Sequence, residues 1–234
     1  MPYGLIIDTL AVIAGAFIGV VFGKYIPDRM KESLTIFFGM ICFTLGITLV
    51  IGVNSLVPVG VALVLGTATG EAFNLDGKLQ SATKKLQNAI AERQGKNGDE
   101  SAAAGVVTLL PLFCINTTII LGSINDAMGD YTVLLVKSVL DFFTAIVFAA
   151  NFGLIISLLS VPLLLIGMVF FGLSSLLGPI LTPAVVADLN ACGGIHCMAV
   201  AFNVIGIKHI RVNNAIPALV YVVPLTILWG MVGL

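Results

Sequence analysis

The sequence predicts an all-α, polytopic integral membrane protein with about eight transmembrane helices, on the strength of three observations. Hydrophobic residues make up 59% of the 234-residue chain and charged residues only 10%, against about 25% charged in ordinary soluble domains. Mean hydropathy is +1.11, a level that the limited polar surface of a soluble fold this size cannot cover. The net charge of −1 provides no basic surface, so we expect no nucleic-acid partner.

Eight apolar stretches are long enough to cross a bilayer core of about 30 Å as helices. The fifth carries two charged residues, so a count of seven spans is the alternative. The eight stretches are Leu5–Gly23, Leu34–Val53, Leu56–Phe73, Ala102–Ser123, Thr132–Ala150, Leu154–Leu177, Pro183–Ile207 and Ala215–Leu234.

The basic residues favour eight spans with both termini outside. In that arrangement ten of the eleven Lys and Arg residues fall in the cytoplasmic loops 24–33, 74–101 and 208–214. The eleventh, Lys137, lies inside a span, and the outer loops contain none. This distribution satisfies the positive-inside rule. The sequence therefore predicts a multi-pass protein of the cell (inner) membrane, with the lipid bilayer as its first partner.

The longest polar segment, 74–101, begins with apolar residues at helical spacing, including Leu75, Leu79 and Leu86, among several lysines. This pattern predicts a short basic amphipathic helix on the inner leaflet. A solvated connector is the alternative. Residues 94–101 then form a polar linker.

The two ends of the chain resemble each other weakly. The string GLII occurs at 4–7 and at 153–156, and residues 39–52 align with residues 193–206. The first three spans would then correspond to the last three, an offset of five spans that inverts one copy relative to the other. Inverted repeats are typical of secondary transporters, although chance similarity between apolar segments is the alternative. The predicted parts of this single transmembrane domain are residues 1–73, 74–101, 102–152 and 153–234.

Small residues recur every four positions in two spans. The first span contains Gly15, Gly19 and Gly23, and the third contains Ala62, Gly66 and Gly70. Such faces allow helices to approach closely. We expect packing within the chain, with a homo-oligomer contact as the alternative.

The fifth span carries the charges that are hardest to explain in a bilayer. Lys137 and Asp141 are four residues apart, so they can pair on one helix face with Thr144 one turn beyond. A charge in hydrocarbon costs at least about 2.5–3.5 kcal/mol. The pair is therefore either a neutral packing device or a coupling site, where Asp141 takes a proton or cation and Lys137 is the counter-charge.

The fourth span has polar residues at its centre, five positions after Pro111. Asn116, Thr117 and Thr118 indicate either a broken helix of the kind that forms solute sites, or a kinked helix whose hydroxyls bond its own carbonyls. The candidate pathway residues, including three at span ends, are Glu71, Asn116, Thr117, Thr118, Ser123, Asp126, Lys137, Asp141 and Thr144.

Asp188, Cys192 and His196 follow one another at four-residue intervals in the seventh span. A metal cluster is one hypothesis, but Gly193 and Gly194 interrupt the face, and a buried, hydrogen-bonded histidine is the favoured interpretation. We therefore expect no metal site and no cofactor. The chain has no phosphate-binding loop and no hydrolase motif, so we do not expect an enzyme.

Several stretches resemble the YqgA-like bacterial membrane proteins, the family catalogued as domain of unknown function 554. The similarity is carried by Leu112–Cys114, Ile120–Asp126, Lys137–Asp141, Gly70–Glu71 and Ile205–Ile207 with the residues that follow. The resemblance implies a polytopic cell-membrane protein and supplies no chemistry. The leading functional hypothesis is a secondary transporter of a small solute or ion, coupled to protons or sodium. An ion channel and a non-transporting membrane scaffold or regulator are the alternatives.

Overall fold

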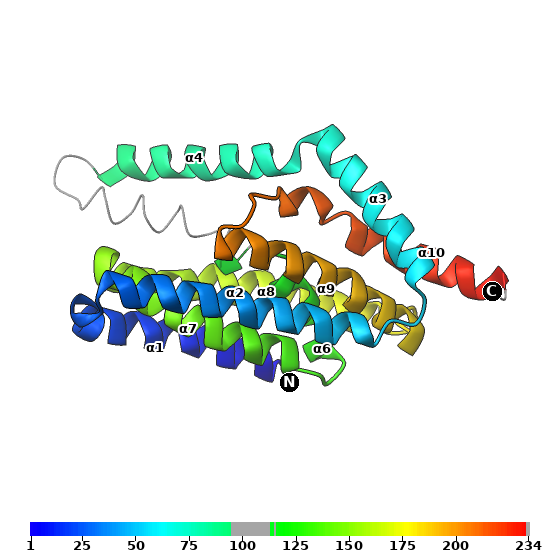
Figure 1. Cartoon of the computed structure of the whole chain (residues 1–234), viewed down its shortest axis with the longest axis horizontal. Coiled ribbons are helices and arrows are strands. Elements are labelled where there is room, and N and C mark those ends of the chain that lie inside the picture. Colours follow the sequence, from blue (N-terminus) through cyan, green and yellow to red (C-terminus); the bar gives the residue numbers. More distant parts are fainter. Residues whose placement is uncertain (95–112, 115, 233–234) are drawn as a thin grey trace. The chain divides into compact units, whose positions relative to one another are not determined.

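A computed structural model describes residues 1–94, 113–114 and 116–232, and the described part of the chain is helical without a strand (Figure 1). The longer helices are α1 (Tyr3–Phe22), α2 (Asp28–Ile51), α3 (Leu56–Phe73), α4 (Leu75–Gln94), α6 (Thr117–Ala127), α7 (Thr132–Phe152), α8 (Ser160–Leu176), α9 (Pro183–Ile205) and α10 (Ala218–Val232). Three short 3₁₀ segments are η1 (Gly23–Tyr25), η3 (Gly153–Leu159) and η4 (Val212–Ala215).

The predicted all-α membrane fold is confirmed. Six segments of the described residues are long and apolar enough to span a membrane, and one of them, Thr132–Leu176, is 45 residues long and includes both α7 and α8. The third predicted span coincides with α3, and most others agree with a helix to within a few residues.

The fourth predicted span differs from the structure. Residues 102–112 and 115 of that span lie outside the described residues. The part that is described does not form one helix, because Asn116 is extended (φ −138°, ψ 161°) and α6 begins after it. With 11 residues, α6 is about 16 Å long, roughly half of a bilayer core.

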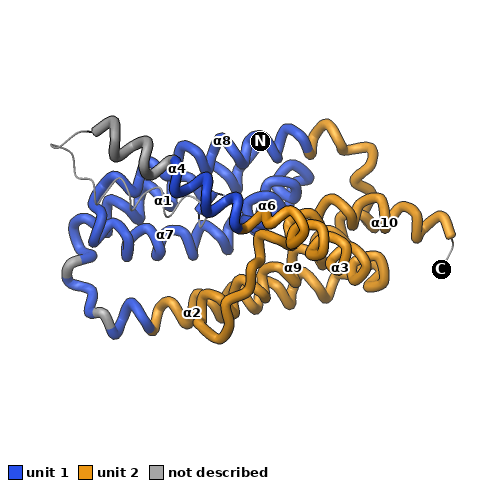
Figure 2. The backbone as a smooth tube through the Cα atoms, turned by 90° about the horizontal axis from the view of Figure 1, so that it is seen from above, with its two compact units in different colours: residues 1–32, 77–173 blue, residues 33–76, 174–234 orange. Residues whose placement is uncertain are grey.

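The chain forms two compact units (Figure 2). Unit 1 contains residues 1–32 and 77–173, and unit 2 contains residues 33–76 and 174–234. These boundaries differ from those of the predicted repeat, in which residues 1–73 would form one copy. The inverted repeat therefore remains a prediction.

In unit 1 the small-residue face of α1 packs directly on α7. A Cβ atom added to Gly15 would meet the carbonyl of Phe142, and one added to Gly19 would meet the carbonyl of Ile146 and lie 2.8 Å from the Cβ of Ala149. The predicted intramolecular packing of this face is confirmed. Only glycine permits so close an approach of two backbones.

The helices α1 and α7 run in the same direction. Gly4, at the start of α1, lies against Leu134 near the start of α7, and Gly23 lies against Ala150 near its end. After α7 the chain turns at Gly153 (φ +74°), and α8 returns far enough for Gly167 to pack on Leu5. The core of unit 1 is formed by Leu5, Val12, Ala16, Phe113, Cys114, Ile119, Leu134, Ala145, Ala149, Ile156, Leu159 and Leu163.

Unit 2 repeats this use of small residues. Gly66 of α3 lies against Ala218 of α10, and Gly70 lies against the backbone of Asn214, so the second small-residue face also packs within the chain. In the same unit Gly46 of α2 meets Gly194 of α9.

The predicted amphipathic segment is helix α4. It follows α3 directly, after a left-handed turn at Asn74 (φ 47°). Two asparagines fix this corner: the Asp76 N–H donates to the Asn214 side chain at 2.7 Å, and the Asn213 amide donates to Asp76 at 2.8 Å. Lys84 and Lys85 are exposed on α4. Residues 95–101 of the predicted linker lie outside the described residues.

Large apolar side chains are exposed on several helices. Phe37 of α2, Val64 of α3 and Val169 of α8 are 66–70% exposed. A soluble protein rarely exposes so many large apolar groups on its helices. In a membrane these side chains contact lipid, which is the predicted first partner.

Candidate functional site

The polar centre of unit 1 is a charged trio formed by Asp8, Lys137 and Asp141. The Lys137 ammonium donates to Asp8 Oδ2 at 2.9 Å and to Asp141 Oδ2 one turn along its own helix. The predicted pairing of Lys137 with Asp141 is confirmed, and Asp8 joins them from α1. The trio thus contains two carboxylates and one ammonium, a formal charge of −1.

The charged trio is buried. The side chain of Asp8 is 0% exposed, that of Lys137 is 4% exposed and that of Asp141 is 12% exposed. Asp8 is the sixth residue of α1, about 8 Å along the helix from its start. The trio therefore lies nearer the first end of α1 than the second.

One oxygen of Asp8 has no partner among the residues that the structure describes. Its Oδ2 binds Lys137, whereas Oδ1 is buried and accepts no hydrogen bond. An unsatisfied buried carboxylate oxygen is costly, and such groups in native proteins call for an explanation. Asp8 and Asp141 contact the same Lys137 Nζ atom, so the two carboxyl groups lie close together and a proton on one is near the other.

Asp126, a predicted pathway residue, connects α6 to the start of α1. Its Oδ2 accepts the backbone N–H of Leu5 at 3.2 Å, and its Oδ1 is buried without a partner. A carboxylate at a helix N-terminus is favourable because it complements the free N–H groups and the helix dipole. Ser123, one turn earlier, donates to the Ile119 carbonyl at 2.6 Å.

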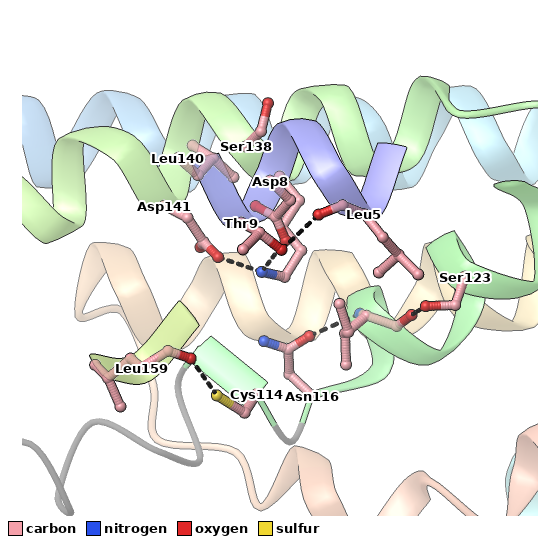
Figure 3. Close-up of polar contacts among 12 residues, drawn as sticks. Leu5, Asp8, Thr9, Cys114, Asn116, Ser123, Ser138, Leu140, Asp141 and Leu159 are labelled. Atoms are coloured by element: carbon pink, nitrogen blue, oxygen red, sulfur yellow. Dashed lines mark hydrogen bonds and ion pairs between the residues drawn. The ribbon is translucent and has the colours of Figure 1, made fainter. Parts of the chain in front are cut away.

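The break before α6 lies beside the trio. Asn116 caps α6 by accepting the N–H of Ile119 at 2.9 Å, a common role for asparagine. Figure 3 shows Asn116 and Cys114 together with Asp8 and Asp141. Cys114 packs in the same core cluster as Leu5 and Val12 of α1, the helix that contributes Asp8.

The structure places the remaining candidate residues as follows. Thr117 is buried and Thr118 is half-buried at the start of α6. Thr144 lies one turn beyond Asp141 and donates to the Leu140 carbonyl of its own helix. Glu71 is in unit 2, where its half-exposed carboxylate pairs with Arg211 at 3.5 Å. Unit 1 therefore contains every candidate residue except Glu71.

Asp188 of unit 2, which the metal hypothesis treats as a ligand, instead accepts hydrogen bonds from backbone and hydroxyl groups. It accepts the N–H groups of Asn54 and Ser55 at 2.9 and 2.7 Å and the hydroxyl of Thr226 at 2.9 Å. It thus holds the turn that leads into α3 and ties this turn to α9 and α10. His196 Nδ1 lies 2.8 Å from the Cys192 carbonyl. Among the described residues, no three His, Cys, Asp or Glu side chains are arranged to hold a metal ion.

The main residue that the sequence does not identify is Asp8. An aspartate inside an apolar stretch is itself a signal, because an intramembrane charge needs a partner. The partner lies 129 residues away along the chain, so the pairing depends on the contact between α1 and α7.

Comparison with known proteins identifies the family. A family model described as "Protein of unknown function (DUF554)" matches residues 3–227. The chain belongs to the DUF554 family. The predicted resemblance is thereby confirmed over nearly the whole length.

Two relatives are similar to this chain over almost its whole length. The "Uncharacterized protein YqgA" of Escherichia coli (strain K12) is 35% identical over 230 residues, 98% of each chain. The "Uncharacterized membrane protein YdfK" of Bacillus subtilis (strain 168) is 28% identical over 222 residues, 93% of this chain and 92% of the relative. No solved structure matches the chain. The printed name of the Bacillus subtilis relative agrees with the apolar helices in indicating a membrane protein.

Proposed function

We propose that this protein is a secondary transporter, in which the charged trio couples the movement of a small solute to that of a cation. The observation that carries the proposal is the trio itself. Two spanning helices bury two carboxylates around one ammonium, and one carboxylate oxygen has no partner. Intramembrane ionisable groups are expensive and most often mark ion or substrate pathways.

The interruption before α6 supports the same proposal. Transporters commonly bind solutes where a helix is discontinuous, because the helix ends offer backbone groups and an oriented dipole. Asn116 provides such an interruption, and Cys114 just before it packs in the same core as Leu5 and Val12 of α1, the helix that contributes Asp8. A solute binding there would be near the coupling charges, as co-transport requires.

The helix directions favour eight crossings with both termini on the same side. In unit 1, α1 and α7 are parallel and α8 returns; in unit 2, Gly66 with Ala218 and Gly70 with Asn214 make α3 and α10 antiparallel. Eight crossings reproduce these directions if the segment ending in α6 crosses once. The basic residues of the loops then favour an orientation with both termini outside, in a protein of the cell (inner) membrane.

The test is a flux assay on purified protein in liposomes. Proton and sodium movement is followed with and without a panel of small anions and amino acids, for the wild type, Asp8→Asn and Asp141→Asn. We expect solute-dependent ion flux in the wild type and its loss in both variants. Asp130→Asn is the matched control, because Asp130 is an exposed carboxylate whose cap on Thr132 the amide oxygen can retain.

Each other outcome has a distinct meaning. Ion flux that needs no solute and cannot concentrate one would indicate a channel. Absence of flux under every gradient, with folded and inserted protein, would refute transport and conduction together.

A further inference from the structure

We infer that the coupling ion is a proton, that the charged trio holds one at a time, and that Asp8 and Asp141 share it while Lys137 remains the resident cation. This inference rests on the proposed function and names its ion. It is argued from the position of the ammonium, the unpaired oxygen and the charge balance.

The first argument is that the place of a metal cation is already taken. Lys137 Nζ lies between the two carboxylates, 2.9 Å from Asp8 and in contact with Asp141. A sodium ion on the same oxygens would lie within a few ångströms of the ammonium. Two unit charges about 4 Å apart repel by about 4 kcal/mol at an effective dielectric constant of 20. A proton needs no such space.

The second argument concerns ligands. Metal cations of this kind require several converging oxygens. The described residues contain no group of three His, Cys, Asp or Glu side chains able to hold a metal ion. A proton needs only one carboxylate oxygen and one acceptor. Among the described residues Asp8 Oδ1 has no partner, and Asp141 contacts the same ammonium as Asp8.

The third argument is the charge balance. With both carboxylates ionised the charged trio carries −1, and uptake of one proton gives 0. The O–H bond forms on one carboxyl group, which donates to the other carboxylate, and Lys137 keeps an ionised partner. A second proton would leave the buried ammonium without any carboxylate, which is strongly unfavourable. The trio therefore has a capacity of one proton.

Among the described residues of unit 1, two further titratable side chains are buried, those of Cys114 and Asp126. Asp126 on α6 is held by the Leu5 N–H, and Cys114 precedes α6. The segment that returns along α1 and α7, residues 153–173, contains no ionisable residue. Asp126, whose Oδ1 is also unpaired, is the one other buried carboxylate among the described residues of unit 1.

The direct test is infrared spectroscopy of the purified protein in lipid, which detects the carbonyl stretch of a protonated buried carboxyl group. In the wild type we expect this band to rise as pH falls and to be unchanged when sodium replaces choline. Asp8→Asn and Asp141→Asn should each lose the band, because one carboxylate with Lys137 is already neutral. Asp126→Asn and Asp130→Asn should retain it.

Several results would overturn the inference. These are a wild type without a titrating band, a band removed by sodium, and a band lost only in Asp126→Asn. The two wild-type measurements decide the matter even if a variant fails to fold. Sodium-driven solute flux without proton movement would refute the proton as the coupling ion while leaving the proposal of transport intact. A titrating band without any flux would refute transport while leaving the proton site intact.

Discussion

Replacing Lys137 with methionine is the sharpest test of the charged trio, because it leaves two buried carboxylates without a cation. At the 2.9 Å separation of Lys137 Nζ and Asp8 Oδ2, the attraction is about 6 kcal/mol at an effective dielectric constant near 20. Desolvation offsets part of this, and breaking a buried pair costs about 3–5 kcal/mol. We therefore expect the unfolding equilibrium constant of Lys137→Met to rise by roughly 10²–10⁴.

Asp8→Asn should be milder, because Lys137 keeps Asp141 and the amide oxygen can still accept a hydrogen bond. The expected loss is about 1–3 kcal/mol. Thermal unfolding can be followed with a thiol-reactive fluorophore, since all four cysteines are free and buried. Lys85→Met, at an exposed position of α4, is the control. The reasoning fails if Lys137→Met unfolds like the wild type, or if Asp8→Asn is the less stable of the two.

Three further predictions use the same unfolding assay or a labelling assay. Gly66→Ala should lower the free energy of unfolding by about 1–3 kcal/mol through overpacking. Gly60→Ala, with open space around Gly60, should leave the free energy of unfolding unchanged or raise it by up to about 1 kcal/mol through helix propensity. Equal unfolding midpoints for the two variants would contradict the close packing of α3. Asp188→Ala should lower the free energy of unfolding by at least about 2 kcal/mol, because it releases the turn before α3, and Thr226→Val by only about 1 kcal/mol, since it removes one of three hydrogen bonds. The reverse order would show that Asp188 does not hold this turn. A cysteine at Ser81, exposed on α4, should react with an impermeant thiol reagent only from the cytoplasmic side, and labelling of intact cells would reverse the predicted orientation.

The helices could be predicted because the length of an apolar stretch is a local property of the sequence, and it can be compared directly with the thickness of a bilayer. The stretch Leu56–Phe73 therefore agrees with α3 in both bounds. The pairing of Lys137 with Asp141 could be predicted for a similar reason, because helical periodicity alone brings positions four apart together.

The partners of these residues could not be predicted, because they depend on contacts between distant helices. Asp8 reaches Lys137 because α1 and α7 run parallel and their backbones approach closely at the glycines of α1. Asp188 appeared to belong with Cys192 and His196 because of its spacing, yet its partners are at the start of α3 and on α10. For Asn116 the sequence left a broken and a kinked helix open, and the structure shows the extended backbone of a cap.

The glycine face of α1 has a consequence for the axial register of that helix. Interlocking side chains normally prevent one helix from sliding along another, as knobs fitting into holes do in coiled coils. Gly15, Gly19 and Gly23 present almost no such knobs to α7. The ion pair between Asp8 and Lys137 then selects one axial register of α1 against α7, a role well attested for buried polar groups. A change in the charge of Asp8 would weaken this ion pair and the preference for one register. Protonation of a single carboxylate would then allow α1 to shift along its axis relative to α7.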